Sequence, residues 1–196
     1  MDAAAAVVAA AAGADAIGLV FAPSRRHVTV AQARRIAAEI PPFVTKVGVF
    51  VDDDLARIHE VADAVRLDAV QLHGSESPEF ASALPLPVIK AIRMRDRRSA
   101  ASMQAYQVSA FLLDSFEPDL AGGTGKAFNW ALAAGLQASA PLILAGGLTA
   151  ANVQQALETV HPFGVDVSSG VETDGRKDPR KIREFIARVR EWNGAS

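Results

Sequence analysis

The chain alternates short apolar runs with longer segments in which apolar residues recur at helical spacing. The short runs are rich in Val, Ile and Leu, which is typical of strands buried on both faces of a sheet. The longer segments have the pattern of helices with one apolar face. Because strand and helix follow one another along the whole chain, the pattern predicts a parallel α/β fold.

The predicted elements can be placed by residue number. Strands are expected at 15–21, 45–51, 67–74, 86–92, 110–115 and 141–147, with a last strand and its loop in 163–170. Helices are expected at 2–13, after Thr29, from the acidic turn 52–54 to about Val65, from Ser77, at 99–107, from Trp130 to Pro141, from Thr149, and at 181–192. A (βα)8 TIM barrel has eight strands, so these seven predict a barrel whose first β-strand is missing from the chain. No linker interrupts the series, and one domain spanning 1–196 is expected.

Composition narrows the classes of function. Lys and Arg number 20 against 22 Asp and Glu, which gives a net charge of -2 and argues against a nucleic-acid partner. There is no cysteine, so the 196 residues hold no disulfide, thiolate metal site or cysteine nucleophile. No run is long and apolar enough to span a membrane. The alanine-rich start resembles the apolar part of a signal peptide, but Asp2 stands in place of a basic start and Asp15 interrupts the apolar run. We expect a cytoplasmic protein without a membrane partner.

One strand end stands out as a place for chemistry. The apolar run that begins at Ala110 ends on Asp114, and the glycine-rich loop 122–125 follows. Parallel α/β folds keep their reactive groups at the carboxyl ends of strands. Asp114 is therefore a candidate catalytic carboxylate, although a strand-end aspartate equally often caps a helix or closes a turn.

Two late loops have the composition of phosphate sites. Gly146-Gly147 leaves one strand, and Ser168-Ser169-Gly170 leaves the next. Their backbone N–H groups can approach a phosphate closely, and together they match the usual phosphate position of a barrel. Arg26, in the loop after the first predicted strand, could pair with a substrate carboxylate, with a surface arginine as the alternative. His73 and Lys90 also lie at strand ends, and the remaining histidines lack metal-ligand spacing, so no metal is predicted.

The motifs, taken in order, resemble the phosphoribosylanthranilate isomerases of tryptophan biosynthesis. The matching segments run over nearly the whole chain: 13–21, 41–50, 70–74, 113–115, 122–125, 145–148 and 165–172. The resemblance implies a (βα)8 barrel that performs an Amadori rearrangement on a small phosphoribosyl substrate, without metal or organic cofactor.

The resemblance also implies roles for particular residues. Asp114 matches the general acid that protonates the furanose ring oxygen, after which a base removes the C2 proton. Arg26 matches the residue that contacts the anthranilate moiety. The substrate-binding and phosphate-cradling positions are matched by Gly146, Gly147, Asp166, Ser168, Ser169 and Gly170.

The chain departs from the family at the base. In the family this is a cysteine in a Lys-Ile-Cys-Gly pattern at the end of the first strand, and the chain has neither. Three interpretations stay open: a first strand precedes Met1, the chain is a catalytically impaired barrel that binds a phosphorylated ligand or a partner subunit, or another residue serves as base. An indole-glycerol-phosphate synthase or a ribulose-phosphate epimerase fits less well, because the required lysine set and metal ligands are not found. The sequence does not predict an oligomeric state.

Overall fold

The computed structural model describes residues 2–115 and 129–193. The glycine-rich loop 122–125 and Lys126 therefore lie outside the described residues. The chain forms two compact units, each described by itself below. The first unit comprises Met1–Ala91 with Gln107–Ser109, and the second comprises Ile92–Tyr106 with Ala110–Ser196.

The predicted parallel α/β fold is confirmed. The sheet has seven strands, and their order in it is their order in the sequence. Those beginning in the first unit are β1 (Ala16–Val20), β2 (Thr45–Phe50), β3 (Ala69–Leu72) and β4 (Val88–Met94), all parallel. Those of the second unit are β5 (Ala110–Ser115), β6 (Leu142–Leu144) and β7 (Gly164–Val165), also parallel. Sequential parallel order is what repeated strand–helix–strand connections produce.

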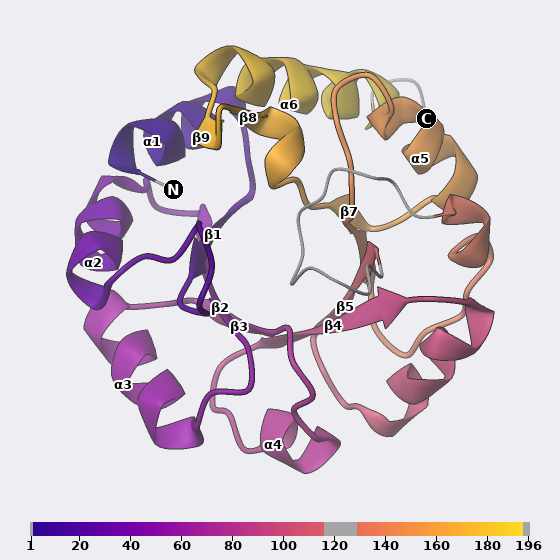
Figure 1. Cartoon of the computed structure of the whole chain (residues 1–196), viewed down its shortest axis with the longest axis horizontal. Helices are drawn as coiled ribbons and strands as arrows, with labels where there is room; N and C mark the ends of the chain where they lie inside the picture. The colour runs from indigo at the N-terminus through magenta and orange to yellow at the C-terminus, as the bar shows by residue number, and fades with distance from the viewer. Residues whose placement is uncertain (1, 116–128, 194–196) are drawn as a thin grey trace. The chain divides into compact units, whose positions relative to one another are not determined.

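The first unit begins its helices where the sequence predicts. They are α1 (Ala3–Ala12), α2 (Val30–Glu39), α3 (Leu55–Val65) and α4 (Pro78–Ser82). The side chain of the residue before each helix accepts a hydrogen bond from a backbone N–H of the first turn, and these caps are Asp2, Thr29, Asp54 and Ser77. Helices α1, α2 and α3 pack side by side along one face of β1–β3 (Figure 1).

The second unit has less regular helix than predicted. Helix 99–107 is a 3₁₀ helix, η1 (Arg97–Ala105). The helix expected from Trp130 to Pro141 is one 3₁₀ turn, η2 (Trp130–Leu132), and Gly135 soon afterwards adopts a left-handed φ of 67° that no continuing helix accepts. Residues 149–152 form a turn, so α5 (Val153–Val160) begins later than the predicted start at Thr149. Helix α6 (Pro179–Asn193) begins two residues before the predicted start at Lys181.

A short hairpin after the last sheet strand was not predicted. A 3₁₀ turn, η3 (Ser169–Val171), leads into β8 (Glu172–Thr173), which pairs antiparallel with β9 (Arg176–Lys177). The two residues between them, Asp174 and Gly175, have φ values of 50° and 75°. Positive φ at both positions is the geometry of a tight hairpin turn, for which Asp-Gly is a preferred sequence.

A buried ion pair in the first unit connects strand β4, which carries Lys90, to the loop after β3, which carries Glu76. Lys90 Nζ lies 2.7 Å from Glu76 Oε2, and the side chains are 4% and 2% exposed. The same ammonium donates to the Gly74 carbonyl at 2.7 Å, and Glu76 accepts hydrogen bonds from the N–H groups of Asp52 and Gly74. This pair therefore fixes the backbone after β2 and after β3.

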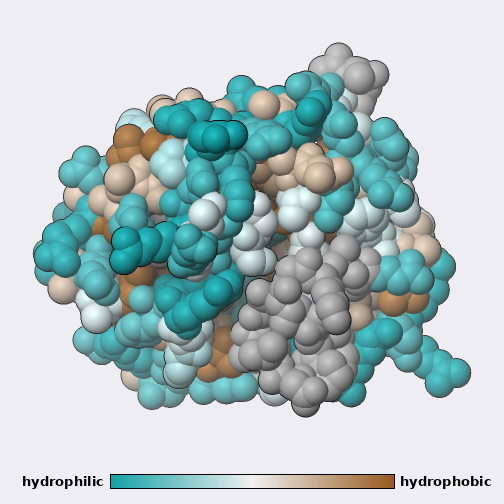
Figure 2. Space-filling model, turned by 45° about the horizontal axis from the view of Figure 1, so that its top comes forward, coloured by the Kyte–Doolittle hydropathy of each residue, from teal (hydrophilic) through white to brown (hydrophobic). Residues whose placement is uncertain are grey.

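The face shown in Figure 2 is mostly polar, and apolar residues appear on it as separate patches. Two large apolar side chains are strongly exposed. Phe43, in the loop before β2, is 102% exposed, and Phe163, in the loop before β7, is 80% exposed. Among the described residues, no helix has the length and apolar character needed to cross a membrane.

Candidate active site

Asp114 lies at the carboxyl end of β5, as predicted. The four residues before it are buried, whereas Asp114 and Ser115 are partly exposed. One carboxylate oxygen of Asp114 accepts the Ser115 N–H at 2.8 Å. A Cβ built on Gly146 would lie 3.0 Å from this oxygen and 2.6 Å from the Ser115 nitrogen. The end of β6 thus comes against the end of β5 at a distance that only glycine permits.

The loop after β6 is held in one shape. Gly146 and Gly147 both have left-handed φ, 80° and 69°. The Asn152 side chain brackets the loop, because its Nδ2 donates to the Gly147 carbonyl at 3.0 Å and its Oδ1 accepts the Thr149 N–H at 2.8 Å. Sequence reasoning missed Asn152, since a single asparagine ahead of a helix usually indicates only a cap.

The loop after β7 packs directly on the loop after β6. A Cβ built on Gly170 would lie 1.8 Å from the Leu148 carbonyl oxygen, so no larger residue fits there. Asp166 continues the ladder by donating its N–H to the Leu144 carbonyl at 2.8 Å, and it is exposed. The structure therefore places Gly146 against Asp114, and places Gly170 against the residues that follow Gly147. The other predicted residues of the second unit, Asp166, Ser168 and Ser169, lie in the chain segment that leads to Gly170.

Arg26, His73 and Lys90 belong to the first unit. Arg26 is partly exposed in the loop after β1, and its N–H donates to Ser24 Oγ at 3.1 Å. His73 Nδ1 lies 2.8 Å from Gln71 Nε2. Lys90 is held in the ion pair with Glu76. His73 and Lys90 thus have the structural partners expected of satisfied polar groups.

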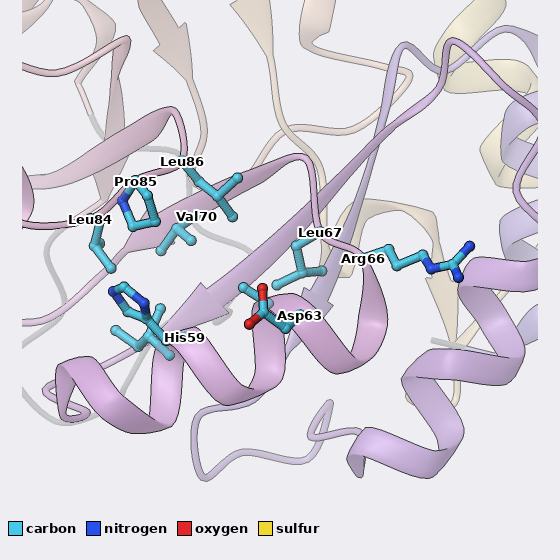
Figure 3. Close-up of a pocket in the computed structure, with 10 residues that line it drawn as sticks. His59, Asp63, Arg66, Leu67, Val70, Leu84, Pro85 and Leu86 are labelled. Atoms are coloured by element: carbon cyan, nitrogen blue, oxygen red, sulfur yellow. The ribbon is translucent and has the colours of Figure 1, made fainter.

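A hollow in the first unit lies away from these strand ends. It has a volume of about 200 Å³ and an apolar floor that includes Ile58 and Val70. Figure 3 shows His59 and Asp63 on α3, and Arg66 just after it, at one side, with Leu84, Pro85 and Leu86 at the other. Leu67 and Leu86 precede β3 and β4, so this hollow lies by the amino ends of the strands, away from where parallel α/β folds place their chemistry. In the parts of the chain that the structure describes, no cluster of His, Asp or Glu has the arrangement of a metal site.

A carboxylate and two interlocked glycine loops at the ends of consecutive parallel strands define an α/β enzyme of the kind that keeps its active site at the carboxyl edge of its sheet. A family model described as N-(5'phosphoribosyl)anthranilate (PRA) isomerase matches residues 1–188. An N-(5'-phosphoribosyl)anthranilate isomerase of Pelobacter propionicus is 52% identical over 193 residues, which cover 97% of this chain and 92% of that protein. The chain belongs to the phosphoribosylanthranilate isomerase family, as its motifs predicted, and is an isomerase.

Solved structures agree with this assignment. The crystal structure of phosphoribosyl anthranilate isomerase from Thermotoga maritima has a TM-score of 0.89 and 40% identity, with 97% of this chain and 95% of that chain covered. A second crystal structure of such an isomerase, in complex with reduced 1-(o-carboxyphenylamino)-1-deoxyribulose 5-phosphate, has a TM-score of 0.82 and 37% identity, with 97% and 94% covered.

Proposed function

We propose that the chain converts N-(5-phosphoribosyl)anthranilate to 1-(2-carboxyphenylamino)-1-deoxyribulose 5-phosphate, an aldose–ketose isomerisation in tryptophan biosynthesis. The observation that carries the proposal is the contact of the Asp114 carboxylate with Gly146, beside the interlocked loops after β6 and β7. An acid next to glycine loops whose backbone N–H groups can meet a phosphate suits a phosphosugar whose ring must open.

The substrate phosphate lies in the two loops. Gly146 and Gly147 present backbone without a Cβ, and Ser168 and Ser169 add hydroxyl donors. Gly170 lets the second loop close onto the first. Together with Asp166 at the start of the second loop, these residues bind the phosphoribosyl end of the substrate.

The proton steps need an acid and a base. Asp114 gives its proton to the furanose oxygen as the ring opens, and a base then removes the C2 proton to form the enolamine, which tautomerises to the ketone. Arg26, at the carboxyl end of β1, pairs with the anthranilate carboxylate through its guanidinium. No metal or organic cofactor takes part in this sequence of steps.

We propose further that residues 1–196 form one barrel domain whose first strand is missing. The burial of β1 supports this. Ile17 and Leu19 are buried, but Ala16 before them and Gly18 between them are exposed, whereas every residue of β3 is buried. Parallel strands with neighbours on both sides are normally covered on both faces, so β1 has the pattern of a strand that lacks a neighbour. The missing strand carries the cysteine base, and the protein acts in the cytoplasm on a small phosphorylated substrate.

A second candidate function is binding without turnover, by an impaired barrel that holds a phosphorylated ligand or a partner subunit. The absence of any cysteine from the chain favours it. Steady-state kinetics and calorimetry on the same preparation distinguish the two. Binding of the reduced product analogue with no turnover, even after a cysteine-bearing strand is supplied, would leave only the binding function.

Replacing the proposed acid should separate chemistry from binding. In a form that carries the family's cysteine strand, Asp114→Asn should lower kcat by roughly 10²–10⁴-fold, the usual contribution of a positioned acid. Binding of the product analogue should change little, because the amide keeps the size of the carboxyl group. Asp63→Asn, at an exposed site on α3, is the control and should leave both quantities unchanged. An Asp114→Asn variant with normal kcat would remove Asp114 from the mechanism.

A further inference from the structure

The β8–β9 hairpin directs a lysine into the loop after β7. Lys177 Nζ donates to the Ser168 carbonyl oxygen at 2.7 Å and lies 3.3 Å from Glu172 Oε1. The two side chains are only 10% and 5% exposed. A nearly buried ammonium thus contacts the Glu172 carboxylate and a backbone carbonyl of the proposed phosphate loop.

This hydrogen bond sets the orientation of one peptide group. The Ser168 carbonyl and the Ser169 N–H belong to the same planar trans peptide and point in opposite directions. With the carbonyl held toward Lys177, the Ser169 N–H projects away from it. An ammonium on the carbonyl also polarises the peptide and makes this N–H a stronger donor to an anion.

The hairpin itself is firmly anchored. Thr173 donates its hydroxyl to Asp178 Oδ2 at 2.8 Å, and Asp178 caps the first turn of α6 by accepting the Arg180 N–H. The pKa of Asp178 is lowered mainly by the hydrogen bond from the Thr173 hydroxyl, and to a smaller extent by the one from the Arg180 backbone N–H. Lys181, on α6, donates to the Glu172 carbonyl at 2.7 Å. Lys177 is therefore presented by a rigid element that lies beside α6 (Figure 1), as precise positioning of a site requires.

We propose that Lys177, balanced by Glu172, is a positioning residue that orients the Ser168–Ser169 peptide toward the substrate phosphate. The proposal rests on the proposed function, in which this loop holds the phosphate. A buried lysine–glutamate pair adds little stability beyond an apolar pair of similar volume, because both ions must be desolvated. Orientation of the loop gives the pair a role that stability alone does not.

The test compares the effects on ligand binding of replacing two nearby lysines, Lys177 and Lys181. Lys177→Met should weaken binding of reduced 1-(o-carboxyphenylamino)-1-deoxyribulose 5-phosphate roughly tenfold to a hundredfold, the range for a charge-assisted hydrogen bond. Binding of the same compound without its phosphate should hardly change, so the preference for the phosphorylated form falls. Inorganic phosphate should compete less well in the same proportion. Lys181→Met is the matched control, because it removes a bond of equal length to the hairpin without touching Ser168.

The outcomes are separable. If the unaltered chain does not bind the phosphorylated analogue, the proposed function fails. If it binds, but Lys177→Met keeps the same phosphate preference as Lys181→Met, only the role of Lys177 is overturned. Should Lys177→Met fail to fold, Lys177→Gln provides the second variant, because its amide stays polar but lacks the positive charge that polarises the Ser168–Ser169 peptide. A clear loss of phosphate preference supports the proposal, and an unchanged preference overturns it.

Discussion

Supplying an N-terminal segment that ends in a Lys-Ile-Cys-Gly pattern should raise isomerase turnover by roughly 10²–10⁴-fold, the contribution expected of a positioned base. The reason is that the 196 residues contain no cysteine, whereas the proposed mechanism needs a cysteine base in addition to Asp114. The melting temperature should rise as well, because the segment would pair with the open edge of β1 and cover Ala16 and Gly18.

A matched segment separates the two effects. With alanine in place of its cysteine, the added strand should still raise the melting temperature but should leave turnover at the level of the chain alone. Equal turnover by the 196-residue chain and by the cysteine-bearing form would mean that another residue is the base.

Breaking the buried pair in the first unit should cause the largest loss of stability. Lys90→Met removes the ammonium that lies 2.7 Å from the buried Glu76 carboxylate, and we expect a loss of about 3–5 kcal/mol in the free energy of unfolding. The loss should also loosen the backbone at Asp52 and Gly74, whose N–H groups Glu76 accepts. Urea denaturation monitored by circular dichroism measures it.

Two controls accompany this measurement. Lys46→Met breaks a pair of the same 2.7 Å length, to Asp68, but those side chains are 21% and 46% exposed, so the loss should be about 0–1 kcal/mol. Combining Lys90→Met with Glu76→Leu should recover part of the stability, because no unpaired charge is left buried. Equal losses of unfolding free energy for Lys90→Met and Lys46→Met would show that the buried pair contributes no more to stability than the exposed pair.

Much of the fold follows from local patterns. Short apolar runs predicted all seven sheet strands because strands buried on both faces need continuous apolar sequence. Thr29 and Ser77 predicted helix starts because their hydroxyls satisfy free N–H groups. The contact between Asp114 and the Gly146 loop could be anticipated as well, since neighbouring parallel strands place their carboxyl ends together.

What the sequence did not predict depends on contacts between distant residues. Glu76 and Lys90 are ordinary charged residues until folding buries them together. The proposed role of Lys177 depends on its hydrogen bond to the Ser168 carbonyl, which forms only in the folded chain. The β8–β9 hairpin did have a local signal, Asp174-Gly175, but strands of two residues have no periodicity to detect. The prediction of a helix from Trp130 to Pro141 was wrong. The alanines of this segment favour a helix, but Gly135 adopts a left-handed conformation that a helix does not continue through.

The central claim is that the loops after β6 and β7 hold the phosphate of an isomerase substrate. Calorimetric titration of the 196-residue chain with reduced 1-(o-carboxyphenylamino)-1-deoxyribulose 5-phosphate, the ligand of a related isomerase, tests it most directly because no turnover is needed. We predict saturable binding at one site, and a large loss of affinity when the phosphate is removed from the ligand. Absence of binding, or equal affinity with and without the phosphate, would contradict the claim.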